Sequence, residues 1–256
     1  MKIWMTGAKG LLGRAMIKAC HGLDFVATGD VDITDLDAMK RFVERHTPTH
    51  LINCAAYTNV DGAESEPELA KAVNTYAVAQ MGKLGVKVVH FSTDFVFDGQ
   101  KNAPYTEEDE PNPLSVYGRT KLEGERQLLC YAPESCVIRI SWLFDLEGPC
   151  FLTKMRQLIQ SEKSVKVVTD QIGRPTFASD AASVCLQLMD QSGIWHFANK
   201  GIVSRYDWIK QAVGGPVEKA VSADFITPAV RPLYSALDTG KIETLGVKIR
   251  PWQECV

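Results

Sequence analysis

The 256-residue sequence lacks several features that mark particular classes of protein. No apolar run reaches the ~18 uninterrupted residues of a membrane-spanning helix. The N-terminus has no charged segment followed by an apolar one, which a secretory signal would have. Basic runs are also missing and the formal net charge is −3, so a nucleic-acid surface has little support. We therefore expect a cytoplasmic protein that binds neither membrane nor nucleic acid.

The seven cysteines are scattered, without CxxC pairs and without a CxxC-to-His spacing. Such a set predicts reduced and mostly buried thiols rather than a disulfide framework. Histidines and carboxylates likewise lack the spacing of metal ligands, and no HExxH motif is present. We expect a site without a metal ion.

Apolar, strand-like runs alternate with helical stretches over most of the chain. The runs are KIWMT (residues 2–6), HLINCAA (50–56), VKVVHFST (86–93) and SCVIRIS (135–141). Parallel strands need crossover connections, usually helices that cover both faces of the sheet. The alternation therefore predicts an α/β fold with a Rossmann-type, doubly wound parallel sheet.

After about residue 143 the alternation loosens and loop-rich segments appear. A content of 45% hydrophobic and 23% charged residues suits one large core with a smaller lobe. We expect residues 1–165 to form a dinucleotide-binding Rossmann domain, with return segments near 170–190 and 231–242. Residues 166–256 are then mainly a smaller C-terminal substrate-binding lobe.

A glycine turn, GAKGLLG, separates the first predicted strand from a predicted helix. Dinucleotide sites use this order because backbone N–H groups and the positive helix end then meet the diphosphate. Asp30 closes the next predicted strand, DFVATGD, at the distance where a carboxylate binds the adenosine ribose. Such a carboxylate repels a 2′-phosphate and argues for NADH.

Tyr117 and Lys121 lie four residues apart in SVYGRTKLEGE, so a helix would place both side chains on one face. An adjacent ammonium stabilises a phenolate and lowers the pKa of the tyrosine, which would make Tyr117 a proton donor. The alternative is an exposed tyrosine beside a solvated lysine. Residues 97–115, rich in proline and acidic residues, are predicted to form a loop that leads into this helix and borders the active site.

Seven short segments, in order along nearly the whole chain, resemble the extended short-chain dehydrogenase/reductases and, within them, the dTDP-4-dehydrorhamnose reductases. They are GAKGLLG, NCAAYTNVDGAESEPELAKAVN, STDFVFDG, PLSVYGRTKLEGE, RISW, DQIGRPT and RPLYSALD. The resemblance implies NADPH or NADH as cofactor. It also implies reduction of the 4-keto group of dTDP-4-dehydro-L-rhamnose to give dTDP-L-rhamnose.

The resemblance also implies roles for individual residues. The implied catalytic group is Thr93, Tyr117 and Lys121. The implied cofactor contacts are Gly7, Gly10, Leu11, Leu12, Gly13, Asp30, Asp32, Ile33, Ala55, Ala56, Tyr57, Tyr117 and Lys121. The implied substrate contacts are Asp94, Trp142, Arg174 and Arg231.

Several of these residues have structural alternatives. Leu11 and Leu12 also suit a core, and Trp142 suits core packing at a strand end. Asp32 equally suits a helix cap. A threonine such as Thr93 is common in strands, whereas Arg174 and Arg231 also suit surface ion pairs. His90, on the strand before Thr93, is interpreted as a buried strand histidine and not as a general base.

Phe95 stands where many members of the family have tyrosine, and the chain is short for the family, so the sugar substrate stays open. Rival functions are another nucleotide-sugar epimerase or reductase, and a cofactor-binding regulatory subunit resembling the beta subunit of methionine adenosyltransferase. Some related reductases depend on magnesium through an acidic residue just after the glycine turn. This chain has Arg14 and Ala15 at that place. A homodimer is the default expectation for a soluble enzyme.

Overall fold

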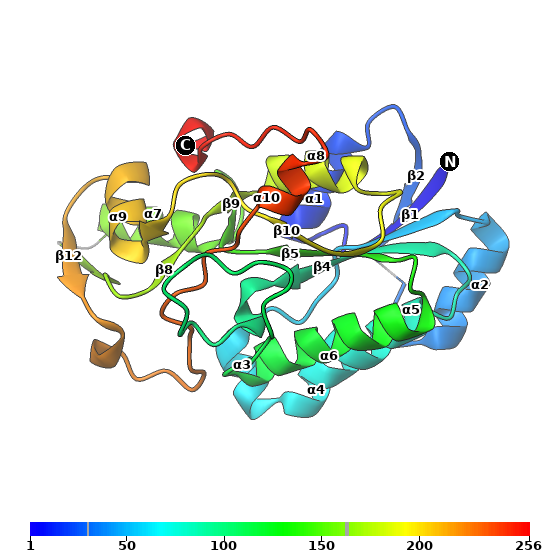
Figure 1. The fold of residues 1–256 in the computed structure, drawn as a ribbon, viewed down its shortest axis with the longest axis horizontal. Coiled ribbons are helices and arrows are strands. Elements are labelled where there is room, and N and C mark those ends of the chain that lie inside the picture. The colour runs from blue at the N-terminus through cyan, green and yellow to red at the C-terminus, as the bar shows by residue number, and fades with distance from the viewer. Residues whose placement is uncertain (30, 162–163) are drawn as a thin grey trace.

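A six-stranded parallel sheet forms the centre of the protein (Figure 1), whose computed structural model describes residues 1–29, 31–161 and 164–256. The strand order is β10-β5-β4-β3-β1-β2, and each neighbouring pair is parallel. The prediction of a Rossmann-type parallel sheet is therefore confirmed. The strands are β1 (Lys2–Thr6), β2 (Asp24–Ala27), β3 (His50–Asn53), β4 (Lys87–Thr93), β5 (Cys136–Ile140) and β10 (Gly193–Phe197).

Helices cover both faces of this sheet, with α1, α8 and α10 on one side and α5 and α6 on the other in Figure 1. α1 packs on α8, and α6 packs on α5 and β4. A π-helical turn, Ala72–Tyr76, and a 3₁₀ turn, Asp94–Val96, follow α4 and β4. The helices are α1 (Leu11–Ala19), α2 (Leu36–His46), α3 (Val60–Ser65), α4 (Pro67–Lys71), α5 (Ala77–Met81), α6 (Val116–Tyr131), α8 (Ala178–Gln187) and α10 (Gly240–Glu243).

The start of α6 is fixed by its N-cap, Ser115. The Ser115 side chain accepts a hydrogen bond from the backbone N–H of Gly118 at 3.1 Å, which satisfies one of the free donors at a helix start. The backbone N–H of Val116 donates to the Glu64 carboxylate at 2.8 Å. These two contacts anchor the first turn of α6, where Tyr117 lies.

Short strand pairs and two helices form the remaining part, drawn at the left of Figure 1. Their core contains Trp142, Phe144 and Trp208. β10 belongs to the large sheet although it lies outside the return segments that we predicted, and the division into two lobes stays a prediction. The elements are β6 (Leu143–Phe144), α7 (Phe151–Ser161), β7 (Val165–Val168), β8 (Ile172–Gly173), β9 (Thr176–Phe177), β11 (Val203–Ser204), α9 (Arg205–Ala212), β12 (Val217–Ala220) and the 3₁₀ turns Ser222–Asp224 and Trp252–Cys255.

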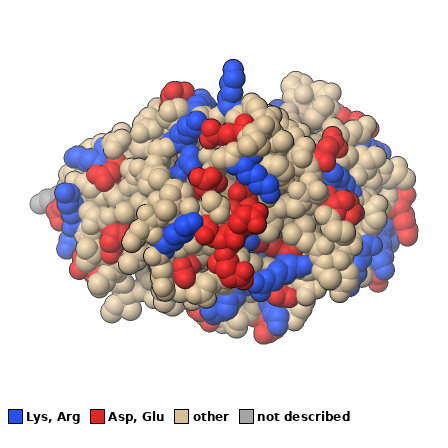
Figure 2. Space-filling model, in the orientation of Figure 1, with Lys and Arg blue, Asp and Glu red and all other residues tan. Residues whose placement is uncertain are grey.

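Acidic and basic side chains are interspersed on the face shown in Figure 2, with acidic side chains gathered near its centre. The seven cysteines are free, and four of them are buried. Within the described residues, no helix is long and apolar enough to cross a membrane.

A buried ion pair ties α6 to the sheet. Arg139 on β5 donates to the Glu125 carboxylate through Nε at 3.0 Å and through Nη2 at 2.7 Å, and both side chains are almost fully buried. The attraction between the two charges offsets the free energy of removing them from water, and it is lost when either partner is removed. The pair therefore holds α6 at one place on the sheet.

We predict that Arg139→Met lowers the free energy of unfolding by about 3–5 kcal/mol, because it leaves the Glu125 charge buried and unpaired. Urea denaturation measures this change. Lys200→Met is the control, since Lys200 pairs with Glu243 at an exposed site and its loss should cost less than about 1 kcal/mol. Equal losses in the two variants would contradict the prediction.

Candidate functional site

A cavity of about 760 Å³ lies where β1, β3 and β4 end at their carboxyl termini. Ligands bind at this edge in open parallel sheets, because the loops after the strands leave a crevice there. The cavity brings together the glycine turn and the start of α6. The predicted site residues among its lining are Gly7, Gly10, Leu11, Leu12, Ala55, Ala56, Thr93, Asp94, Tyr117, Lys121, Trp142 and Arg231.

The glycine turn passes so close to the loop after β3 that Gly7 has no room for a side chain. Gly7 has φ +69°, and a Cβ added there would lie 2.5 Å from the backbone nitrogen of Ala55. Gly10 is the N-cap of α1, so the free N–H groups and positive end of that helix lie beside the cavity. Gly13 lies in the first turn of α1. This cradle fits the diphosphate of a dinucleotide.

Of the predicted cofactor residues that the structure describes, Gly13, Asp32, Ile33 and Tyr57 are not among those that line the cavity. Asp30 lies outside the described residues. Asp32 accepts from the backbone N–H and hydroxyl of Thr34, and the N-cap of α2 is Asp35, not Asp32. Ile33 is buried in the core beside the sheet, and the Tyr57 hydroxyl donates to Glu66 at 2.7 Å.

Thr93 and Tyr117 are neighbours in the lining of the cavity. Thr93 is the last residue of β4, and its hydroxyl accepts the backbone N–H of Phe95 at 3.1 Å. A hydrogen bond with Thr93 lowers the pKa of Tyr117, but burial outweighs it and raises that pKa to about 12. The Phe95 ring packs edge-on against the Tyr117 ring at 5.7 Å.

Lys121 is fully enclosed between α6 and β4. Its Nζ donates to the carbonyl oxygen of Phe91 at 2.6 Å and lies 3.1 Å from His90 Nε2. Burial lowers the pKa of Lys121 to about 8. The expected lowering of the Tyr117 pKa by Lys121 is therefore not found, because desolvation dominates at both side chains.

Asp94 links the sheet to the loop after β12. Its carboxylate accepts from the Ser235 hydroxyl at 2.5 Å and from the Thr93 hydroxyl at 3.2 Å. Burial raises the pKa of Asp94 to about 6, while these hydrogen bonds and the Arg205 charge oppose the rise. A carboxyl group that changes charge near neutral pH therefore lies beside Thr93.

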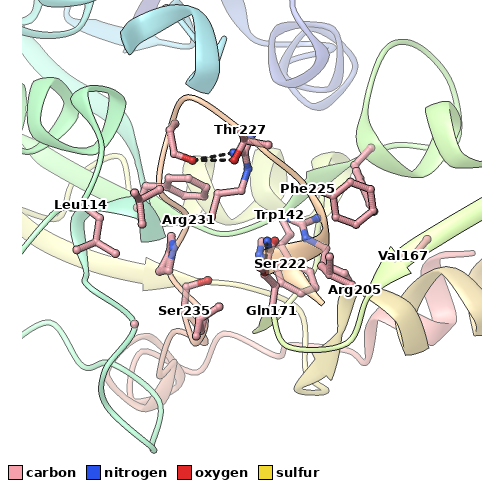
Figure 3. A pocket seen from close by; sticks show the side chains of 18 of the residues that line it. Leu114, Trp142, Val167, Gln171, Arg205, Ser222, Phe225, Thr227, Arg231 and Ser235 are labelled. Carbon is pink, nitrogen blue, oxygen red and sulfur yellow. Dashed lines mark hydrogen bonds between the residues drawn. The ribbon is translucent and has the colours of Figure 1, made fainter. Parts of the chain in front are cut away.

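A second cavity, of about 810 Å³, adjoins the first and is shown in Figure 3. Both cavities are lined by Phe95, Trp142, Phe151, Arg205 and Arg231, so these residues form the wall between them. The Arg205 guanidinium lies 3.6 Å from the centre of the Trp142 ring and 4.7 Å from that of Phe151. Trp142 has φ +48°, a strained conformation typical of functional sites.

The two predicted substrate arginines lie in different surroundings. Arg231 lines both cavities and binds Asp61 of α3 through both nitrogens, at 2.7 and 3.1 Å. Arg174 is instead buried outside the described cavity linings, where it donates to the carbonyl oxygens of Asn199 and Leu237. Arg231 therefore lies at the site, whereas Arg174 holds two loops together. Because Arg174 is buried it forms no surface ion pair, and its contact with the substrate stays a prediction.

The family model for the RmlD substrate binding domain matches residues 1–256. The chain belongs to this family. A relative named dTDP-4-dehydrorhamnose reductase, from Mycolicibacterium smegmatis, is 37% identical over 275 residues, covering 100% of this chain and 84% of that protein.

Two solved structures named dTDP-4-dehydrorhamnose reductase share the fold of this chain. A dTDP-4-dehydrorhamnose reductase from Clostridium acetobutylicum superposes with a TM-score of 0.96 at 36% identity, covering 100% of this chain and 96% of that one. A dTDP-4-dehydrorhamnose reductase from Bacillus anthracis, solved in complex with NADP, gives 0.94 at 29% identity over 99% and 97% of the chains.

Sequence reasoning on this RmlD-family chain missed three cavity residues. Arg205 follows Ser204, which caps α9, so the sequence SRYD signalled a helix start but not a stacked arginine. Ser235 lies in the recognised segment RPLYSALD, yet only the fold brings its hydroxyl to Asp94. The buried Ser92 hydroxyl lines the first cavity and has no hydrogen-bond partner within the described part of the chain.

We predict that Gly7→Ala weakens NADPH binding roughly tenfold or more, because its Cβ would push the glycine turn away from Ala55. A fluorescence titration measures the affinity. Gly22→Ala is the matched control: Gly22 also has positive φ, +88°, but a Cβ there meets nothing within 4 Å. If both variants lost the same affinity, backbone strain and not close approach would be the cause.

We predict a pH-dependent stability effect for Asp94→Asn. Because the folded-state pKa of Asp94, about 6, lies above its ordinary value, 3.8, the folded chain holds an extra proton between these pH values. Wild-type stability is therefore lost as the pH rises from about 4 to about 6. The variant escapes this loss and should gain about 1–3 kcal/mol relative to wild type between pH 4 and pH 8.

Urea denaturation at both pH values tests this prediction. Asp98→Asn is the control, since hydrogen bonds such as that from Gln100 lower the pKa of Asp98 below its ordinary value of 3.8. The stability that Asp98 contributes is lost only as the pH falls below about 4, so the difference between Asp98→Asn and wild type should stay nearly constant from pH 4 to pH 8. An Asp94→Asn difference that does not depend on pH would refute the assignment.

Proposed function

We propose that this chain reduces the 4-keto group of dTDP-4-dehydro-L-rhamnose to dTDP-L-rhamnose, with NADPH or NADH as cofactor. The observation that carries the proposal is that Thr93, Tyr117 and Lys121 line the same cavity as the glycine turn. Membership of the RmlD family supports it, as does the name dTDP-4-dehydrorhamnose reductase that its relatives bear.

The first cavity would hold the cofactor along its length. The diphosphate would lie at Gly7, Gly10 and the start of α1, where backbone donors and the helix dipole favour negative charge. Lys121, with Ser92 nearby in the wall, would bind at the nicotinamide end. When bound, the nicotinamide supplies a hydride to the carbonyl carbon.

Tyr117 and Thr93 would act on the keto oxygen. Reduction of a ketone adds a hydride at carbon and a proton at oxygen, and we assign this proton to the Tyr117 hydroxyl. The Thr93 hydroxyl, at the end of β4, would hydrogen-bond the same oxygen and orient the carbonyl group. A phenol with a pKa of about 12 holds its proton until the alkoxide forms.

The second cavity would bind the dTDP-sugar. Arg205 and Arg231 present two guanidinium groups at the wall between the cavities, and planar guanidinium groups suit diphosphate oxygens. Trp142 offers an aromatic face beside Arg205, and Asp94 offers a carboxyl group next to Thr93. We keep Trp142, Asp94 and Arg231 as substrate contacts and add Arg205.

The cofactor preference, the metal-free site and the homodimer remain predictions. Asp30, on which the argument for NADH rests, lies outside the described residues. Among the described side chains, no group of three or more His, Cys, Asp or Glu residues is arranged to hold a metal ion. Assays with each cofactor, with and without magnesium, address the first two points.

We predict that Tyr117→Phe lowers the rate of reduction by about 10²–10⁴-fold and leaves NADPH affinity within about twofold, because only the transferred proton is lost. The assay follows NADPH or NADH oxidation with dTDP-4-dehydro-L-rhamnose. Tyr131→Phe, at the exposed end of the same helix, is the control and should keep full activity.

Two results would count against the assignment. Wild-type protein that binds NADPH tightly but leaves this keto sugar unreduced would redirect the proposal to another keto sugar. An active Tyr117→Phe variant would instead remove Tyr117 from the reaction and leave the substrate assignment standing.

A further inference from the structure

A row of buried polar side chains crosses the sheet beneath the first cavity and ends at Lys121. Thr6 of β1, Asn53 of β3 and His90 of β4 are direct partners in the strand register. The Thr6 hydroxyl lies 2.6 Å from Asn53 Oδ1, Asn53 Nδ2 lies 3.0 Å from His90 Nδ1, and His90 Nε2 lies 3.1 Å from Lys121 Nζ. All four residues are buried.

The orientation of the Asn53 amide is fixed by the backbone. Its Oδ1 accepts the N–H of Ala55 at 3.1 Å, and a backbone N–H can only donate. Its NH₂ group must therefore face His90, where it donates to Nδ1. A neutral imidazole carries one proton, so an accepting Nδ1 places that proton on Nε2.

The Nε2–H group of His90 then points at the Lys121 nitrogen. An uncharged amine accepts this hydrogen bond with its lone pair and still donates to the carbonyl oxygen of Phe91. An ammonium group has no lone pair, so two donors would face each other at 3.1 Å. The opposite histidine tautomer only moves the same conflict to the contact with Asn53.

We propose that His90 is a positioning residue that disfavours the charged form of Lys121, so that this lysine changes its charge within the working pH range. The catalytic consequence rests on the proposed reductase function, whereas the histidine tautomer does not. His90 thus acts on the reaction through Lys121 and not by touching the substrate.

The surroundings agree with this geometry. Burial alone lowers the pKa of His90, and a charged Lys121 would lower it further, so the imidazole is neutral in either state of the lysine. Burial also lowers the pKa of Lys121, while Glu125, one turn further along α6, opposes that change. The other titratable side chains in the lining of the same cavity are Cys54, Asp94, Tyr117, Cys150, Arg205 and Arg231.

The first test reads the tautomer in the wild-type chain. Long-range ¹H–¹⁵N correlation spectra of ¹⁵N-histidine-labelled protein, recorded between pH 6 and pH 8, distinguish protonated from unprotonated ring nitrogens. The signals of the five histidines are compared, and His90→Gln identifies the one that disappears. If that variant fails to fold, the signal displaced in Lys121→Met identifies His90 instead.

A proton on Nε2 alone supports the proposal. A proton on Nδ1 alone, or on both nitrogens, overturns it. Neither reading involves the substrate, so a failure of this test is distinct from a failure of the reductase assignment.

The second test follows the pH dependence of turnover, with NADPH affinity as the readout if the keto sugar is not reduced. A glutamine oxygen can accept a hydrogen bond from the Lys121 ammonium group and so stabilises the charged lysine. His90→Gln should therefore move the alkaline inflection of the pH–turnover curve upward by about one pH unit. His196→Gln is the matched control. His196 is equally buried on β10, but its ring contacts the Tyr105 carbonyl oxygen and Arg139.

An inflection that moves in His90→Gln and not in His196→Gln supports the proposal. An unmoved inflection in both variants overturns it, and so does an equal shift in both, since that would report a general loss of packing.

Discussion

The close approach of α6 to the sheet is the constraint on which the rest of the site depends. Gly118, in the first turn of α6, meets the carbonyl oxygen of Phe95 so closely that a Cβ would collide with it. The buried pair of Glu125 and Arg139 holds the same helix two turns later. Fixed at both places, α6 presents Tyr117 and Lys121 to the ends of the strands without relying on a flexible loop.

The low polarity produced by this packing gives the site its chemistry. Burial shifts the pKa values of Asp94, Tyr117 and Lys121 in the direction that disfavours charge on each of them. Three ionisable groups therefore share one cavity while their charged forms are all less stable than in water. Because little water is present to screen charges in this buried site, a bound anion would shift the pKa of each group more strongly than it would at the surface.

Much of the fold and part of the site followed from local sequence patterns. The alternation of apolar runs with helices was enough to predict the parallel sheet. The order of strand, turn and helix was enough to predict the glycine turn at Gly7. Spacing within α6 placed Tyr117 and Lys121 on one face. These features depend on residues near one another in the chain, which is why the sequence predicts them.

The remaining features depend on contacts between distant segments. Ser235 reaches Asp94 across 141 positions, and Arg139 on β5 reaches back to Glu125 on the preceding helix, α6. The proline after Arg174 suggested that Arg174 lies in an exposed loop. The Arg174 guanidinium is instead buried and donates to carbonyl oxygens of two other loops. Likewise, the direction of the Tyr117 pKa depends on burial, which spacing along a helix does not reveal.

The ion pair between Arg231 and Asp61 has a consequence for selectivity. Arg231 lines both cavities, yet its guanidinium is already bound by a carboxylate. A ligand that uses this arginine must either replace Asp61 or share it, so its affinity is the difference between two interactions. Singly charged or neutral sugars gain little from that exchange, whereas a diphosphate offers more charge than the carboxylate it displaces. In the proposed function, Asp61 would therefore compete with the ligand for Arg231, and ligands with more negative charge would be favoured.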